Sequence, residues 1–111
     1  MNTRYCLALD IRDDPSAIAA YDEYHKNVWP EIRESIITAG IRTMDIYRTG
    51  NRLFMIMEVD EHFSFEKKTA MDRGNQKVKE WEDLMWTFLQ PLPHTGERNW
   101  ILMDRVFSLN G

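Results

Sequence analysis

The residues of this sequence that are best suited to acid–base chemistry lie in one short stretch before position 31. Tyr21, His25 and Trp29 follow one another at intervals of four, so a helix that continued through all three would carry them on one face. The imidazole of His25 is the group among them that titrates near neutral pH. The pattern indicates either an acid–base site walled by aromatic rings or a structural histidine among core aromatics.

Three residues elsewhere are candidates for the same site. Asp45 and Tyr47 share one face of an expected strand with Ile41, and Trp81 lies on the inner face of an expected late helix. If helices cover that strand face, these side chains converge with Tyr21 and the histidine in one pocket. Buried tyrosine and tryptophan need partners for their polar atoms, which a bound polyol would supply. The alternative is that Trp81 belongs to the core.

The elements that must position these residues follow the order β-α-β-β-α-β. Strands are expected over 5–11, 41–49, 52–60 and 100–109, with a Gly50-Asn51 turn between the second and third. Helices are expected from 17 to about 27, over 31–39 after a break at Pro30, over 63–73 and over 75–89. This order predicts one ferredoxin-like α+β domain over 1–111, with a four-stranded antiparallel sheet and helices on one face.

Both faces of the expected sheet are apolar. In the third strand Leu53, Met55, Met57 and Val59 lie on one face, and Phe54 and Ile56 lie on the other. A sheet with one face in water alternates apolar with polar residues, so something beyond the helices must cover the second face. A second copy of the sheet is the economical answer, and loops with the C-terminal tail are the alternative.

Composition excludes several classes of function. The 14 basic and 18 acidic residues give a net charge of −4 spread along the chain, whereas nucleic acids and anionic membranes require clustered basic residues. No apolar run is long enough to span a bilayer, and Asp10 ends the first one, so we expect no signal peptide and a cytoplasmic location. The single cysteine, Cys6, excludes an internal disulfide and fits a reducing compartment.

Metal and cofactor chemistry has no motif in the sequence. There is no Gly-rich phosphate loop and no serine-nucleophile motif. The three histidines, His25, His62 and His94, lack the spacing of metal ligands. We therefore expect an activity that uses neither a metal nor a cofactor.

Five short motifs resemble, in order, the L-rhamnose mutarotase family. They are Tyr21-x-x-x-His25-x-x-x-Trp29-Pro30-Glu31, Ile46-Tyr47, Leu53-Phe54, Trp81-x-x-x-Met85 and Val106-Phe107-Ser108-Leu109. The resemblance implies a dimeric α/β barrel of ferredoxin-like subunits that interconverts the α and β anomers of a 6-deoxy-L-sugar. It places the proton donor at His25 and substrate contacts at Tyr21, Tyr47 and Trp81. The reaction also requires a second acid or base, for which Asp45 is a candidate. Trp29, like Trp81, is a candidate to pack its ring against the sugar.

Two features of the chain leave the sugar open between L-rhamnose and L-fucose. The pattern of rhamnose-specific members looks like a Trp-Trp pair at the position where this chain has Trp81-Glu82. The segment 90–98 looks closer to the corresponding segment of relatives associated with L-fucose. The fold also hosts cofactor-free monooxygenases and ligand-binding dimeric modules, so the fold alone does not choose the function.

Overall fold

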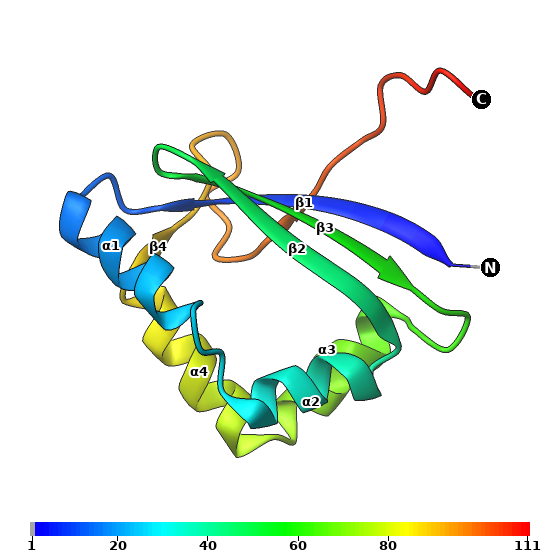
Figure 1. Cartoon of the computed structure of the whole chain (residues 1–111), viewed down its shortest axis with the longest axis horizontal. Helices are drawn as coiled ribbons and strands as arrows, with labels where there is room; N and C mark the ends of the chain where they lie inside the picture. Colours follow the sequence, from blue (N-terminus) through cyan, green and yellow to red (C-terminus); the bar gives the residue numbers. More distant parts are fainter. Residues whose placement is uncertain (1) are drawn as a thin grey trace.

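The computed structural model describes residues 2–111 as one antiparallel sheet with all helices on one side of it (Figure 1). The body of the sheet is β1 (Thr3–Ile11), β2 (Ile41–Thr49) and β3 (Arg52–Val59), in the order β2-β3-β1. Two short strands, β4 (Leu89–Gln90) and β5 (Ile101–Leu102), pair with β1. The predicted α+β fold is confirmed, with the last strand replaced by these two shorter ones.

The helices are α1 (Pro15–Tyr24), α2 (Pro30–Thr38), α3 (Phe65–Arg73) and α4 (Gln76–Trp86). The Asp14 carboxylate caps α1 by accepting the backbone N–H of Ser16 at 2.9 Å, and Pro15 fits the first turn because it has no N–H to leave unpaired. Within residues 2–111, no helix is both long and apolar enough to cross a membrane.

The predicted continuation of the first helix beyond position 24 is wrong. The helix ends at Tyr24, and Trp29 instead caps α2, with φ −55° and ψ 137°. The ring of Pro30 disfavours helical backbone at the residue before it, which accounts for the extended conformation of Trp29. The three aromatic residues spaced by four therefore come from two helices and the connection between them.

Gly40 separates α2 from β2 at a position that excludes side chains. Its φ is +100°, and a Cβ there would lie 2.6 Å from the Asp60 carboxylate. The expected left-handed stop after the second helix is confirmed. The hairpin turn is also confirmed, because Gly50 has φ +56° between β2 and β3.

The alternation of β3 separates the two faces of the sheet as predicted. The side chains under the helices are buried, namely Leu53, Met55, Met57 and Val59. Phe54 and Ile56 point to the other side, pair with Ala8 and Cys6 of β1, and are half-buried. We call this surface, formed by Cys6, Ala8, Phe54 and Ile56, the open face.

The C-terminal segment leaves the sheet where the sequence predicted a strand to position 109. After β5, the Met103 N–H donates to the Cys6 carbonyl at 2.8 Å, and the chain then runs away from the sheet (Figure 1). Val106, Phe107 and Leu109 are 95, 75 and 83% exposed. The strand is lost because these apolar side chains meet no apolar layer within their own chain.

Candidate active site

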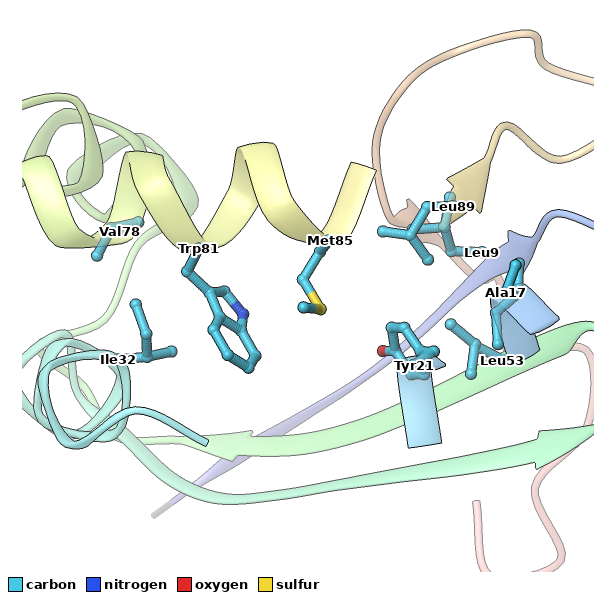
Figure 2. Close-up of a cluster of buried hydrophobic side chains, with 10 residues drawn as sticks. Leu9, Ala17, Tyr21, Ile32, Leu53, Val78, Trp81, Met85 and Leu89 are labelled. Carbon is cyan, nitrogen blue, oxygen red and sulfur yellow. The ribbon is translucent and has the colours of Figure 1, made fainter. Parts of the chain in front are cut away.

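A cavity of about 700 Å³ lies between the helix layer and the sheet. Its walls come from α1, α2 and α4, from β2, and from the segment before β5. The wall includes Tyr21, His25, Met44, Ile46, Trp81, Glu82 and Arg98. Figure 2 shows Trp81 and Met85 pointing from α4 into the space between the helices and the sheet, with Met85 between Trp81 and Tyr21 in this view. The cavity is large enough to hold a monosaccharide.

His25 lies at the end of α1, where its ring is held by the helix itself. Its Nδ1 is 2.8 Å from the Tyr21 carbonyl oxygen. A carbonyl oxygen only accepts hydrogen bonds, so Nδ1 carries the proton of the neutral ring and donates it here. Nε2 then keeps its lone pair, which makes it the ring nitrogen available as a base.

The surroundings of His25 favour this neutral form. Burial lowers the pKa of His25 below its usual value, opposed by the bond to the Tyr21 carbonyl and by the negative charge of Asp22. The pKa of Tyr21 is raised, first by burial and then by Asp22, so its phenol keeps its proton. The pair therefore offers one base and one hydroxyl donor at neutral pH.

Aromatic rings surround the imidazole. The Tyr21 ring stacks on His25 with centroids 4.0 Å apart, and the Trp81 ring meets His25 edge-on at 5.6 Å. The Trp29 ring also meets Trp81 edge-on, with centroids 5.1 Å apart, but Trp29 does not itself border the cavity. The structure thus brings together Tyr21, His25, Trp29 and Trp81, although the helix does not continue to Trp29. Such a wall suits the C–H faces of a sugar ring.

An ion pair ties α1 to the sheet one turn before His25. Arg48 at the end of β2 donates from Nε and Nη2 to the two carboxylate oxygens of Asp22, at 3.0 and 2.7 Å. This bidentate geometry fixes the helix relative to β2 better than a single contact.

The prediction that Asp45 and Tyr47 face the helices is wrong. A β-bulge at Arg42 adds one residue to β2 after Ile41, which reverses the alternation beyond it. Asp45 then pairs with Ile56 and Tyr47 with Phe54, so both side chains share the side of the open face. Asp45 borders the cavity through its position on the edge strand, whereas Tyr47 is 59% exposed and lies outside it.

Two residues that the sequence analysis missed take their place. Met44 and Ile46 of β2 face the helices and border the cavity. The sequence contains a signal for these two residues, because they alternate with polar neighbours. An alternation counted from Ile41 without the bulge places Met44 and Ile46 on the face opposite the helices.

The remaining histidines lie away from this site. His62 is exposed next to Glu61, and neither His62 nor His94 borders the cavity. In the described part of the chain, no three His, Cys, Asp or Glu side chains are grouped so as to hold a metal ion.

Comparisons of the sequence with known proteins show its family. The sequence profile of a family described as L-rhamnose mutarotase matches residues 4–109. An L-fucose mutarotase of Xanthomonas campestris is 40% identical over 111 aligned residues, covering 96% of this chain and 88% of that protein.

Solved structures show the same fold. The crystal structure of an L-rhamnose mutarotase from Formosa agariphila superposes with a TM-score of 0.71 at 23% identity, covering 96% of this chain and 98% of that one. The tetracenomycin F2 cyclase of Streptomyces glaucescens, a type-II polyketide cyclase, gives a TM-score of 0.61 at 17% identity, covering 96 and 95%. At these identities the likeness concerns the fold alone.

Proposed function

The chain belongs to the L-rhamnose mutarotase family, whose members interconvert sugar anomers, and we propose that its substrate is a 6-deoxy-L-sugar and its acid–base group His25. The observation that carries the residue assignment is the imidazole with Nδ1 engaged and Nε2 free, inside a cavity walled by aromatic rings. Residues 1–111 act as one catalytic domain in this proposal.

The proposed reaction needs one base and one acid in each direction. Nε2 of His25 accepts the proton of the anomeric hydroxyl while C1=O1 forms, the C1–O5 bond breaks, and O5 takes a proton from water in the cavity. The open aldehyde rotates about C1–C2. On closure O5 attacks C1 and gives its proton back to the hydroxide that the water became, while the imidazolium returns a proton to O1. A histidine suits this exchange because both of its protonation states are accessible near neutral pH.

The other residues of the wall hold the sugar in this proposal. The protonated Tyr21 phenol orients a sugar hydroxyl, and the indole ring of Trp81 packs on the C–H face and the methyl group. Trp29 does not border the cavity and acts in this proposal by holding the Trp81 ring, which it contacts edge-on. Asp45 is left out of the proton transfer, because its side chain shares the side of Ile56. Tyr47 is left out for the same reason.

The lowered pKa of His25 predicts the pH dependence. The base is free above its pKa, so kcat/KM stays level at neutral pH and falls as the pH drops through a pKa below the usual value of about 6.5. Solvent-corrected rates between pH 4 and 8, roughly spanning that value, measure the midpoint. A midpoint above the usual histidine value would contradict the neutral, buried imidazole.

We propose that the protein is a homodimer in which two open faces pack against each other. Phe54 and Ile56 are apolar side chains that no helix covers, and Val106, Phe107 and Leu109 are exposed on a segment that has left its own sheet. A second copy buries both surfaces at once and closes a dimeric α/β barrel. Sedimentation then gives twice 13.2 kDa.

We propose further that the reaction needs neither a metal nor a cofactor, and that it takes place in the cytoplasm, where Cys6 remains reduced. Activity that survives exhaustive EDTA treatment supports the first point. Activity that is lost and then restored by one specific metal refutes it.

NMR saturation transfer tests the activity directly. We expect transfer between the α and β anomeric protons of L-fucose or L-rhamnose with micromolar enzyme, at a pH where the uncatalysed exchange is too slow to see. Heat-denatured enzyme is the control. Absence of transfer with both sugars would refute the proposed substrate class.

A further inference from the structure

Arg48 has no part in the proposed proton transfer, yet each nitrogen of its guanidinium group donates a hydrogen bond. Nε and Nη2 donate to the two carboxylate oxygens of Asp22 on α1, at 3.0 and 2.7 Å. Nη1 donates to the Gly50 carbonyl oxygen at 2.8 Å, inside the turn between β2 and β3. The side chain therefore joins the last turn of α1 to the hairpin in one defined geometry.

The hairpin is a firm support for this contact, because it is itself anchored to β1. The Ile11 N–H donates to the Asn51 carbonyl at 2.7 Å, and the Asn51 side-chain amide donates to the Ile11 carbonyl at 2.9 Å. Arg52 donates from Nε and Nη2 to the carboxylate of Asp10, at 2.8 and 3.1 Å. Asp10 is 2% exposed, so water and salt weaken this second pair little. A continuous set of bonds leads from β1 to Arg48.

The end of α1 depends on such a tie, because the side chains that it buries are apolar in their contacts. Ala17 and Tyr21 are its buried residues, and apolar burial is non-directional, so it sets the depth of the helix better than its rotation. Asp22 lies about 100° further around the helix than Tyr21. Within residues 2–111, no other side-chain hydrogen bond or ion pair joins α1 to the sheet. The bond to Arg48 therefore fixes the rotation of the last turn.

The rotation of this turn determines where the imidazole of His25 points. The backbone N–H and the Nδ1 of His25 both bond to the Tyr21 carbonyl oxygen, at 3.2 and 2.8 Å. The ring is thereby fixed to the last turn of α1 and moves with it. The placement of that turn beside the cavity sets the distance from Nε2 to anything bound there.

We infer that Arg48 is a positioning residue, which acts through Asp22 to hold the end of α1 at the angle that brings the His25 imidazole to the anomeric hydroxyl. This inference rests on the proposed function. A reacting group displaced by about 1 Å can lose about 100-fold in rate, so a small rotation of the helix end is enough to slow proton transfer. The Arg48 and Asp22 side chains are 33 and 44% exposed, and ion pairs of this kind contribute little to folding. The pair should therefore affect the rate more than the stability.

The test measures kcat and KM for mutarotation by Arg48→Gln, on the level part of the pH profile. We expect kcat to fall about tenfold with KM within about threefold, because the position of the base matters in the transition state and not for ground-state binding. The melting temperature should fall by no more than about 5 °C. Arg48→Lys keeps the charge but loses the fork of donors, so it should also lower kcat.

Asp22→Asn removes the other partner of the pair and should lower kcat by a similar factor. It also removes a charge that raises the pKa of His25, so Arg48→Gln, which leaves that charge in place, is the cleaner variant. The double variant should lose no more than either single one, within about twofold, because two residues that act as one unit are not additive.

Glu23→Gln is the matched control. Glu23 is the neighbour of Asp22 on α1, but it pairs with Lys26 at 2.9 Å, close by in the chain, rather than with the sheet. The substitution removes one negative charge near His25 without breaking a tie between elements, so kcat should stay within about twofold of the wild type.

The outcomes separate this inference from the proposed function. A wild-type protein without mutarotase activity on any 6-deoxy sugar refutes the proposed function. An active wild type whose Arg48→Gln and Asp22→Asn variants keep kcat within about twofold refutes the positioning role alone. An equal loss with Glu23→Gln refutes it as well, and so do losses that add up in the double variant. If Arg48→Gln unfolds early, Asp22→Asn, which keeps the size of the side chain, decides: a lowered kcat with unchanged KM supports the inference, and an unchanged kcat overturns it.

Discussion

The two faces of the sheet are built from alternate residues of the same strands, yet they differ in what covers them. Under the helices, the buried residues of β3 pack in a layer that also encloses a cavity with Tyr21 and His25 on its wall. On the open face, Phe54 and Ile56 have no covering layer from their own chain. Both faces are apolar, but only the first encloses a cavity with an imidazole on its wall.

This difference has a physical basis. An imidazole changes its pKa only where burial or a neighbouring charge acts on it, and α1 supplies both at His25. A flat apolar surface supplies neither, and it gains most by burial against a like surface. This comparison supports the proposed roles of the two faces, which are proton transfer for the covered face and assembly for the open one.

The largest effect should come from His25→Ala. Loss of the proposed acid–base group should lower kcat by about 10²- to 10⁴-fold. Because the ring lies outside the open face, the sedimentation coefficient should stay that of the wild type. His62→Ala and His94→Ala, at residues that do not border the cavity, are the controls. Equal modest losses in all three would mean that His25 is structural.

A second large effect should appear on the open face with Ile56→Asp. A carboxylate without a partner in the centre of a sheet-to-sheet contact weakens association by about 100-fold or more, so the protein should sediment near 13.2 kDa. Lys79→Gln, at an exposed position of α4, makes the net charge more negative by the same single unit outside that contact and should leave the mass unchanged. An Ile56→Asp dimer as stable as wild type would place the interface elsewhere.

These two faces also show which features of the fold can be predicted from the sequence. The alternation in 52–59 identified both faces of β3, and Gly40 and Gly50 marked the ends of β2, because these signals are local. The bulge at Arg42 has no local signal, since any residue can be the extra one, and it moved Tyr47 to the other side. The end of the last strand depends on what the C-terminal segment packs against, which no local pattern encodes.

In the candidate site, too, the sequence predicted the contacts between neighbouring positions and missed those between distant ones. The proximity of Tyr21 and His25 was predicted correctly, because they are four positions apart, which is about one turn of helix. The helix-based reason for including Trp29 failed at Pro30, yet the short connection between α1 and α2 still brings its ring to Trp81. Arg98 borders the same cavity and carries its guanidinium over the ring of Trp86, a contact between distant positions that only the structure shows.

An intermediate effect should come from Trp81, which is both a wall of the cavity and part of the buried cluster, with 8% exposure. Trp81→Phe keeps most of the packing but removes part of the ring surface, so KM should rise about tenfold with kcat little changed, by analogy with stacking on nucleobases. Leu53→Ala is the control, because Leu53 is buried in the same cluster without bordering the cavity. It should lower the free energy of unfolding by roughly 2–5 kcal/mol and leave KM unchanged. A Trp81→Phe protein with lowered stability and unchanged KM would remove the indole from the site.

The smallest effect should be that of Tyr47→Phe, and it tests the assignment of the faces most directly. The bulge places Tyr47 beside Phe54, 59% exposed, so removal of its hydroxyl should change kcat/KM by no more than about twofold. Tyr21→Phe is the matched change on the covered face, where the buried ring stacks on His25, and it should have the larger effect on activity. If Tyr47→Phe instead lowers activity as much as Tyr21→Phe while the dimer persists, the open face contributes to catalysis. The separation between a face for proton transfer and a face for assembly would then fail, because a side chain on the open face would have to reach a cavity, either through the partner subunit or around the edge of β2.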